Sequence, residues 1–429
     1  MRGKIKSLWA NRVIRGGSAL YIGGILVNVF NYFYRVAMGR MMSPADFGEV
    51  IALISLIMIL TVPSTPLHSA GVRFTSEFKA KGQLSKIKSL IVRLTGFVTL
   101  IVSVFAVLAI ILAEPLQQFL SISSLPVFYV FVISIALLTI SSVNRGVLPG
   151  LERFKKTAAM ITVEGAVKFF AAVLLVSAGF QIVGALSAVV ISVAILIAMS
   201  FYYLKDILKV KGDGHFSVDS KVLAYMFFAF LSFLFLNIIL NSDVILVKRY
   251  FSADDAGLYS AISTVGRIVF IAGTALGGIM FPIVRRKKDT GENYFKPFAI
   301  TVALILAITI LASAFLFLFP EFTMQLLFGG KYLEGASILG YYGVAMGLIA
   351  VIFISSSFFL AVDKFSYLYG LFAASMLQLV LIKFWHASFL DVIRALFISI
   401  SLYLLWALIL TLTQYKREIE NIRVNKIAT

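Results

Sequence analysis

Starting at Asn28, the chain reads NVFNYFYRVAMGRMMSPADFGEVIAL, and starting at Asn237 it reads NIILNSDVILVKRYFSADDAGLYSAI. The two stretches align without gaps, and each joins two apolar runs through a short polar turn, which is the pattern of two membrane helices connected by a tight loop. Chance similarity between apolar hairpins is the alternative to duplication, but it does not readily produce matches at polar and glycine positions. The matched residues are Asn28, Arg40, Ser43, Asp46, Gly48 and Ala52 against Asn237, Arg249, Ser252, Asp255, Gly257 and Ala261.

The composition indicates that lipid surrounds much of this chain. Hydrophobic residues make up 60% of the 429 positions and charged residues 14%, whereas soluble domains have about half and about a quarter. The sequence contains no cysteine, which excludes disulfides, thiolate nucleophiles and cysteine-bound metals. It also lacks the phosphate-binding pattern G-x-x-x-x-G-K-S/T. We therefore expect no cofactor and no resident metal.

The apolar runs predict an all-α integral membrane protein with about twelve spans, since one span needs about 20 mostly apolar residues. The repeat places six spans in each half, so the halves share one orientation and form two pseudo-symmetric lobes with a substrate cavity between them. We predict an N-lobe at 1–210 and a C-lobe at 211–429. The expected spans are Gly16–Gly39, Phe47–Val72, Ser89–Ala113, Leu125–Leu148, Thr157–Phe180, Ile182–Leu204, Lys221–Val247, Ala256–Val284, Pro297–Phe319, Ala336–Val362, Ser366–His386 and Val392–Thr413.

Positive charges in the loops predict the orientation, because cytoplasmic loops carry the excess of Lys and Arg. With a cytoplasmic N-terminus, the cytoplasmic segments are 2–15, 73–88, 153–156, 205–211, 285–288 and 416–426, and they hold most of the cations. The opposite loops hold only Arg40, Lys248, Arg249, Lys331 and Arg394. We therefore expect both termini in the cytoplasm and a multi-pass protein of the cell inner (plasma) membrane. The same asymmetry accounts for the net charge of +18 without a nucleic-acid partner.

Two features of the hairpins have a structural interpretation. Ser43 with Asp46, and Ser252 with Asp255, have the spacing of helix caps. Pro63 and Pro66 interrupt the second predicted span and should kink it.

Several motifs resemble one known family. They are GRMMSPADFGEV from Gly39, GVRFTSEFKAKGQ from Gly71, PGLERFKK from Pro149, MFPIVRR from Met280 and FGGKYLEGASILGYYG from Phe328. With these motifs in this order, the chain resembles the polysaccharide-transporter (O-antigen flippase) branch of the multidrug/oligosaccharidyl-lipid/polysaccharide exporter superfamily. The resemblance implies two six-helix lobes, alternating access, and an anionic polyprenyl-diphosphate-linked oligosaccharide that moves from the inner to the outer leaflet. It also implies polysaccharide polymerase and glycosyltransferases as partners in cell-surface polysaccharide synthesis.

Such a substrate needs cations for its phosphates and amides or hydroxyls for its sugars. Charged residues inside a membrane usually face a cavity or a partner. Residues of this kind, which we predict to line the substrate cavity, are Asn28, Asn31, Arg35, Lys168, Asn237, Asn241 and Arg267. Each cation also has a structural alternative to a place in the cavity. In that alternative Arg35 and Arg145 would extend to the lipid headgroups, Lys168 would pair with Glu164 four residues earlier, and Arg267 would pair with Asp243.

Three titratable residues are candidates for coupling to a cation or proton: Asp243, Glu164 and His68. The alternatives are that Asp243 only neutralises Arg267 or Lys248, that Glu164 pairs with Lys168, and that His68 is a packing residue beside the kink.

Two other functions remain alternatives to a flippase. A cation-coupled multidrug exporter of the same superfamily would favour acidic and aromatic residues in its cavity. A membrane glycosyltransferase or polysaccharide polymerase would need paired carboxylates in an outer loop, and Asp254 and Asp255 lie in a short turn. We expect a transporter rather than an enzyme, driven by membrane potential or an ion gradient.

Overall fold

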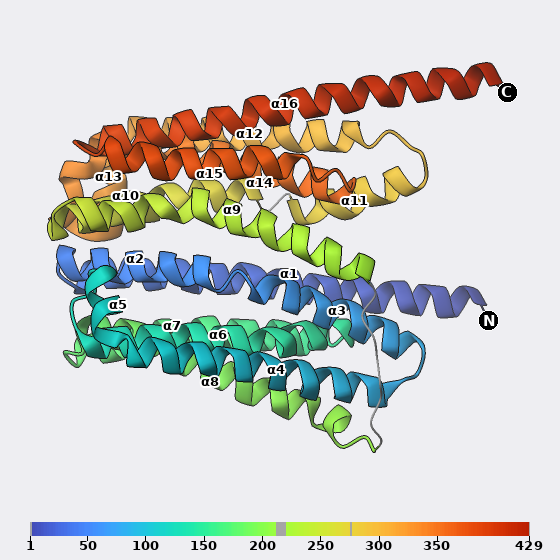
Figure 1. Cartoon of the computed structure of the whole chain (residues 1–429), viewed down its shortest axis with the longest axis horizontal. Coiled ribbons are helices and arrows are strands. Elements are labelled where there is room, and N and C mark those ends of the chain that lie inside the picture. Colours follow the sequence, from blue (N-terminus) through green and yellow to red (C-terminus); the bar gives the residue numbers. More distant parts are fainter. Residues whose placement is uncertain (1, 212–219, 275–276, 429) are drawn as a thin grey trace. The chain divides into compact units, whose positions relative to one another are not determined.

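The computed structural model describes residues 2–211, 220–274 and 277–428, and these ranges contain helices and short connections but no strand (Figure 1). Backbone contacts divide the chain into two compact units, unit 1 (Met1–Phe230) and unit 2 (Leu231–Thr429). The division falls inside α9 (Ser220–Tyr250), because Met226 near the start of this helix packs against the apolar core of unit 1. Two lobes divided at 210/211 stay a prediction. Residues 212–219 of the predicted loop between them lie outside the described ranges.

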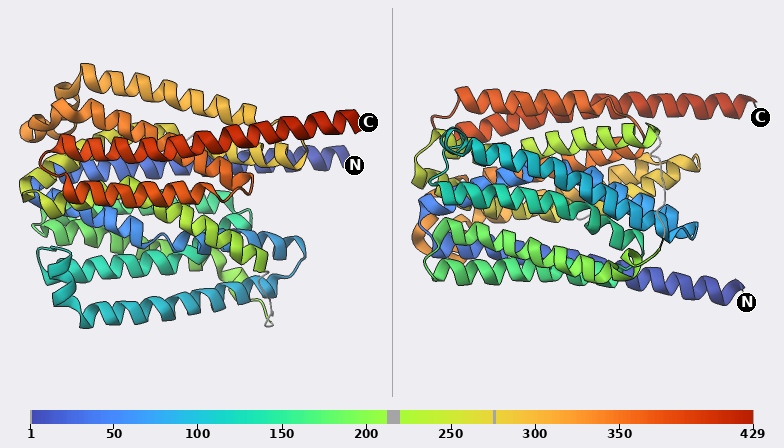
Figure 2. Two further views of the ribbon diagram at one scale, coloured as in Figure 1. Left: turned by 45° about the horizontal axis from the view of Figure 1, so that its top comes forward. Right: turned by 60° about the horizontal axis from the view of Figure 1, so that its bottom comes forward.

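Unit 1 is a bundle in which α6 and α7 both pack against α8, and α1 packs against α7. Short α5 turns across the end of the long helices (Figure 2). The helices of unit 1 before α9 are α1 (Arg2–Met41), α2 (Pro44–Leu60), α3 (Ser64–Ala80), α4 (Leu84–Ile111), α5 (Ala113–Phe119), α6 (Leu125–Gly150), α7 (Phe154–Ser177) and α8 (Gln181–Leu208).

Unit 2 is organised around the buried helix α14, against which α10, α12 and α16 pack. The remainder of α9 leads into α10 through a tight turn. The helices that follow are α10 (Ala253–Thr274), α11 (Gly277–Asp289), α12 (Phe295–Leu318), α13 (Pro320–Phe328), the 3-10 helix η1 (Gly329–Ile338), α14 (Leu339–Ala361), α15 (Tyr367–Phe384) and α16 (Phe389–Ala428).

The protein is a multi-pass membrane protein. Ten helices of the described residues are long and apolar enough to cross a membrane, and α2 with α3 makes an eleventh candidate if this pair, bent by 50°, is one span. That bend confirms the kink predicted from Pro63 and Pro66. Every predicted span coincides with a helix or a helix pair, but α1 is not among the ten, and its Asn28, Asn31 and Arg35 lower its hydropathy. A total of twelve spans therefore stays a prediction.

The two copies of the repeat share one helix cap. In the first copy the Ser43 hydroxyl accepts a hydrogen bond from the Asp46 amide (3.1 Å) and donates one to the Asp46 carboxylate (2.8 Å). In the second copy Ser252 makes the same two bonds with Asp255, at 3.1 and 2.7 Å. The cap orients the start of α2 and of α10 alike and satisfies an amide that the helix itself leaves free. The predicted caps are thus confirmed, which also favours duplication.

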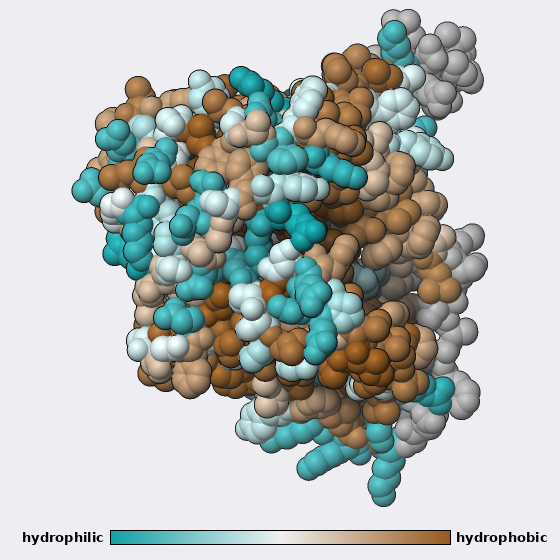
Figure 3. All heavy atoms as spheres, turned by 60° about the vertical axis from the view of Figure 1, so that its left-hand side comes forward, coloured by the Kyte–Doolittle hydropathy of each residue, from teal (hydrophilic) through white to brown (hydrophobic). Residues whose placement is uncertain are grey.

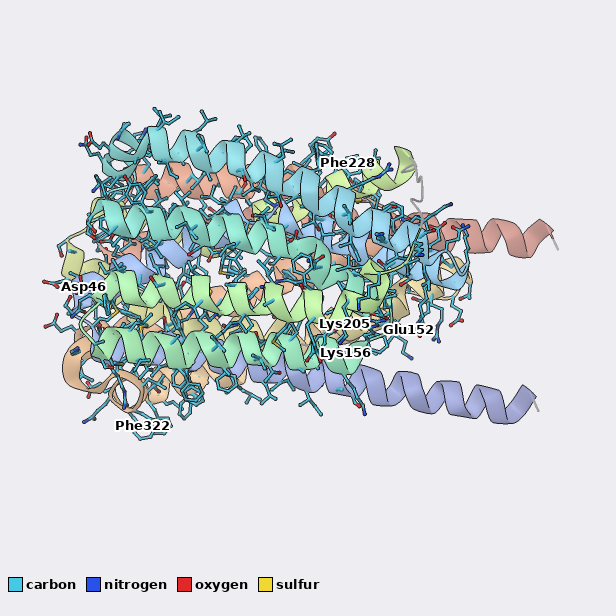
Figure 4. The ribbon with its side chains drawn as sticks, turned by 90° about the horizontal axis from the view of Figure 1, so that it is seen from below. Asp46, Glu152, Lys156, Lys205, Phe228 and Phe322 are labelled. Atoms are coloured by element: carbon cyan, nitrogen blue, oxygen red, sulfur yellow. The ribbon has the colours of Figure 1, made fainter. Side chains whose placement is uncertain are left out.

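Charged side chains gather at the helix ends. Figure 4 shows Glu152, Lys156 and Lys205 at one end of unit 1 and Asp46 at the opposite end. At the first end Lys79 forms an ion pair with Glu152 (2.7 Å). Figure 3 shows hydrophilic side chains at the ends that carry α5 and α13, beside a largely hydrophobic flank. This distribution is typical of helices whose ends lie in water and whose flanks lie in lipid. The orientation of the termini stays a prediction.

In unit 2, Asp363 joins the loop after α14 to the end of α11. Its carboxylate accepts hydrogen bonds from Arg285 (2.6 Å) and Lys288 (2.9 Å). Partial burial acts to raise the pKa of Asp363, but the bonds from these two cations outweigh it and hold the pKa below its usual range. A carboxyl whose pKa is lowered by folding stabilises the fold above its unfolded pKa and loses that contribution as pH falls through the folded value.

Replacing Asp363 with Asn is therefore expected to lower the free energy of unfolding at pH 7 by less than about 1 kcal/mol, because the pair is partly exposed and screened. Asn tolerates the positive φ of 56° at this position, so the substitution removes charge without backbone strain. The difference from wild type should shrink as pH falls below about 4. Thermal unfolding of the purified protein across pH measures this. Glu334→Gln, at an exposed acid of unit 2, is the control; equal stability of Asp363→Asn and wild type at pH 7 would contradict the expectation.

Candidate functional site

Unit 1 contains an arginine held by a carboxylate of the neighbouring helix. From α6, the guanidinium of Arg145 donates two hydrogen bonds to Glu164 of α7, at 2.9 and 2.6 Å, and a third from Nε to Ser141 (3.1 Å). This fork-to-carboxylate geometry is the strongest form of ion pair. Two alternatives considered from the sequence are therefore wrong: Arg145 does not reach for headgroups, and Glu164 pairs with Arg145 instead of Lys168. Local i,i+4 spacing suggested Lys168, but the contact between α6 and α7 decides the partner.

Lys168 turns instead toward the first helix. Its ammonium donates to the side-chain oxygen of Asn31 and lies 5.5 Å from the ring centroid of Tyr34. Gly165, one helical turn away from Lys168, lets α1 approach closely, since a Cβ there would lie 3.0 Å from Val27. Two predicted site residues, Asn31 of α1 and Lys168 of α7, are thereby in direct contact.

These side chains line a cavity of about 250 Å³, walled also by Val27 and Ile161. Its charged lining is Arg145, Glu164 and Lys168, so the lining carries a net positive charge. The charge of Arg35 also acts on Lys168. The cavity can offer an anionic ligand two cations and an amide, in surroundings where charge attraction is stronger than in water.

The other unit 1 candidates lie outside this cavity. Asn28 and His68 are exposed, and neither they nor Arg35 belong to the cavity lining. Asn28 lies one turn before Asn31 on the same helix, but only Asn31 lines the cavity.

Unit 2 contains a fully buried carboxylate held by two tyrosines. Oδ2 of Asp243 in α9 accepts hydrogen bonds from Tyr259 of α10 (3.0 Å) and Tyr342 of α14 (2.7 Å). Its second oxygen, Oδ1, is buried and has no hydrogen-bond partner among the described residues. Gly266 leaves room for Tyr342, because a Cβ there would lie 2.3 Å from the tyrosine ring. An incompletely satisfied buried carboxylate is costly to maintain unless it binds something.

Arg267 acts on Asp243 through its positive charge, but it hydrogen-bonds to groups of α9. It donates to the side-chain oxygen of Asn241 (3.0 Å) and to the Leu240 carbonyl (2.9 Å), and Asn241 donates in turn to the Asn237 carbonyl (3.0 Å). No ion pair joins Arg267 to Asp243 within the described ranges, so the structural alternative left open for Arg267 is not formed. Three predicted site residues, Asn237, Asn241 and Arg267, instead form one chain of hydrogen bonds.

Sequence reasoning missed Gln378, Tyr259 and Tyr342. Gln378 of α15 donates to the Ile239 carbonyl (2.9 Å) and to the Ser242 hydroxyl (2.8 Å), which fixes α9 next to Asp243. A glutamine inside an apolar helix was the available signal for Gln378. Nothing in the sequence distinguished these two tyrosines from the other aromatic residues. No cluster of three or more His, Asp or Glu that could hold a metal occurs among the described residues.

Comparison with solved structures identifies the fold. The chain is similar to "Inward-facing conformation of a multidrug resistance MATE family transporter of the MOP superfamily", at 12% identity and a TM-score of 0.75, with 91% of this chain and 96% of that chain covered. It is also similar to a MATE structure in complex with MaD3S (12%, TM-score 0.65, coverage 94% and 96%). A third similar structure is a MOP superfamily transporter from Pyrococcus furiosus described as having a binding pocket of reverse polarity (12%, TM-score 0.62, coverage 93% and 95%).

The protein thus has a MATE-like fold. The sequence profile described as "Polysaccharide biosynthesis protein" matches residues 13–284, and the chain belongs to this family. No curated protein matches the sequence. The family resemblance predicted from the motifs is confirmed.

Proposed function

We propose that the protein is a flippase that moves a polyprenyl-diphosphate-linked oligosaccharide from the inner to the outer leaflet of the cell inner membrane, for cell-surface polysaccharide synthesis. The observation that carries this proposal is the cavity of unit 1, where Arg145, Lys168 and Asn31 meet. Membership in the polysaccharide biosynthesis family supports it. A cavity for cationic drugs would instead have a net negative lining.

The contacts of the cavity suggest how it handles an anion. Among the described residues Lys168 donates one hydrogen bond, to a neutral amide oxygen, so it has donor capacity left for a phosphate oxygen. Arg145 is neutralised by Glu164 while the cavity is empty, which avoids an uncompensated buried cation. Asn31 brings an amide that can bind a sugar hydroxyl. In this proposal Lys168 recognises the diphosphate, and the Arg145–Glu164 pair keeps the empty cavity stable.

We further propose that a cation or proton gradient drives alternating access through Asp243. Of the three candidates from the sequence, Glu164 is already bound to Arg145, and His68 is exposed. Asp243 is fully buried and keeps one oxygen free of hydrogen bonds among the described residues. A carboxylate with a free oxygen can take up a cation or a proton and release it when its surroundings change.

Lys168→Gln is the test of the flippase proposal. The loss of one charge-assisted hydrogen bond should slow transport of a lipid-linked oligosaccharide diphosphate in proteoliposomes by about tenfold or more. Lys168→Arg, which keeps the charge, should retain more activity, and Lys156→Gln, at the helix end near Tyr203, should transport normally. Unchanged transport by Lys168→Gln would refute the phosphate contact. Export of cationic drugs in place of the lipid-linked sugar would favour the multidrug alternative.

A further inference from the structure

Unit 2 has an apolar groove that plays no part in the proposed transport site. It has a volume of about 470 Å³ and lies between α12 and α16, with α14 as its floor. Two exposed alanines, Ala299 and Ala303, leave the hollow on the surface of α12, and larger side chains such as Leu306 line it. The groove is therefore a built feature of the flank and not an unfilled gap in the core.

The walls of the groove suit a hydrocarbon chain. Two of its three hydroxyl groups are already bonded within their own helices: Ser355 donates to the Val351 carbonyl and Thr411 to the Ala407 carbonyl, both at 2.8 Å. The third belongs to Tyr415 at one end of the groove. The remaining lining is aliphatic or aromatic. A polar ligand would find no partner there, whereas an apolar chain loses nothing by binding.

The length and the end of the groove indicate which lipid fits. Along α12 the lining runs from Phe295 to Leu306, about 16 Å at the rise of an α-helix. That is about half of the 30 Å hydrocarbon core, the depth of one leaflet. Phe295 contacts Tyr415 across the groove, with ring centroids 5.2 Å apart, and closes it at its end.

Two exposed lysines flank that closed end, Lys296 beside Phe295 and Lys416 beside Tyr415. Among the side chains that the structure describes, which end at Lys416, neither lysine has an acidic partner in an ion pair. Cations at this level of a membrane attract anionic headgroups. We propose that the groove binds one acyl chain of an anionic phospholipid, whose headgroup phosphate lies at Lys296 and Lys416.

Lipid retention tests this proposal without any transport assay, so it can fail independently of the flippase. The purified full-length protein is equilibrated with phosphatidylglycerol and phosphatidylethanolamine of matched chains, and bound lipid is counted by native mass spectrometry. Wild type should retain one phosphatidylglycerol. Ala303→Trp should lower its affinity by at least about tenfold, because the indole displaces several methylenes. Ala299→Trp, at a second exposed groove position, should do the same.

Ala307→Trp is the matched control, since Ala307 is exposed on the same helix outside the groove; it should retain the lipid as wild type does. Lys296→Gln combined with Lys416→Gln should abolish the preference for the anionic lipid. The proposal is overturned if both groove tryptophans retain phosphatidylglycerol normally, if phosphatidylethanolamine is retained equally by wild type, or if the lipid carried from the native membrane in this groove is an isoprenoid phosphate. Thermal unfolding of each variant shows that it is folded.

Discussion

Gly146→Ala is expected to destabilise the protein by about 3 kcal/mol, the upper end of the usual cost of overpacking. A Cβ at Gly146 would lie 2.2 Å from the carbonyl oxygen of His68 and 3.1 Å from the Cα of Gly71. Both are backbone atoms, so α3 and α6 would have to move apart. A Cβ on Gly71 would likewise lie only 2.9 Å from the Val143 carbonyl oxygen. Small residues are what permit helices to approach this closely in a membrane. The midpoint of thermal unfolding in detergent measures the loss.

Gly96→Ala is the control for this prediction. Gly96 is exposed in the middle of α4, and a Cβ there meets nothing within 4 Å. Because Ala favours a helix over Gly by up to about 1 kcal/mol, this variant should be as stable as wild type or more so. If both alanine variants unfold at the wild-type temperature, the close contact between α3 and α6 is not what stabilises unit 1.

Much of the fold could be predicted from the sequence because a membrane imposes a simple length rule. Each predicted span coincides with a helix or helix pair, and the repeated Ser–Asp caps and the proline kink followed from local chemistry. Short helices were not predicted: α5 and α13 have seven and nine residues, too few for a periodic pattern. The eighth predicted span consists of two helices, α10 and α11, and residues 275–276 between them lie outside the described ranges.

The candidate sites were predictable only in part, for a physical reason. Burying a charge in a membrane is costly enough that a charged residue in a span indicates a partner, but its position does not tell which one. The i,i+4 spacing predicted Lys168 as the ion-pair partner of Glu164. In the structure the partner is Arg145, because α6 packs against α7. Asp243 binds Tyr342, which lies 99 residues further along the chain, and no local pattern links two such positions. Sequence reasoning thus found most of the polar residues but not their pairing.

Asp243→Asn is expected to lower the rate of transport by about tenfold or more and to abolish the dependence of transport on an imposed gradient. An amide can still accept the hydrogen bonds of Tyr259 and Tyr342 through its oxygen, so the packing around it is conserved. Its nitrogen, however, carries no negative charge and cannot bind a cation or a proton as Oδ1 can. Transport in proteoliposomes, with a proton or sodium gradient imposed or collapsed, gives the measurement. A variant that still responds to the gradient would exclude Asp243 as the coupling site.

A comparison of two buried tyrosines separates coupling from packing. Tyr342→Phe removes one hydrogen bond to Asp243, and Tyr403→Phe removes the hydrogen bond that joins Tyr403 to Ser356 at 2.8 Å, also fully buried in unit 2. Each should cost about 1 kcal/mol of stability. Only the first changes the surroundings of the carboxylate, because Asp243 then keeps the Tyr259 hydrogen bond alone. Tyr342→Phe should therefore shift the ion or pH dependence of transport while Tyr403→Phe leaves it unchanged. If both variants shift it equally, the effect comes from loosened packing, and the carboxylate has no special role.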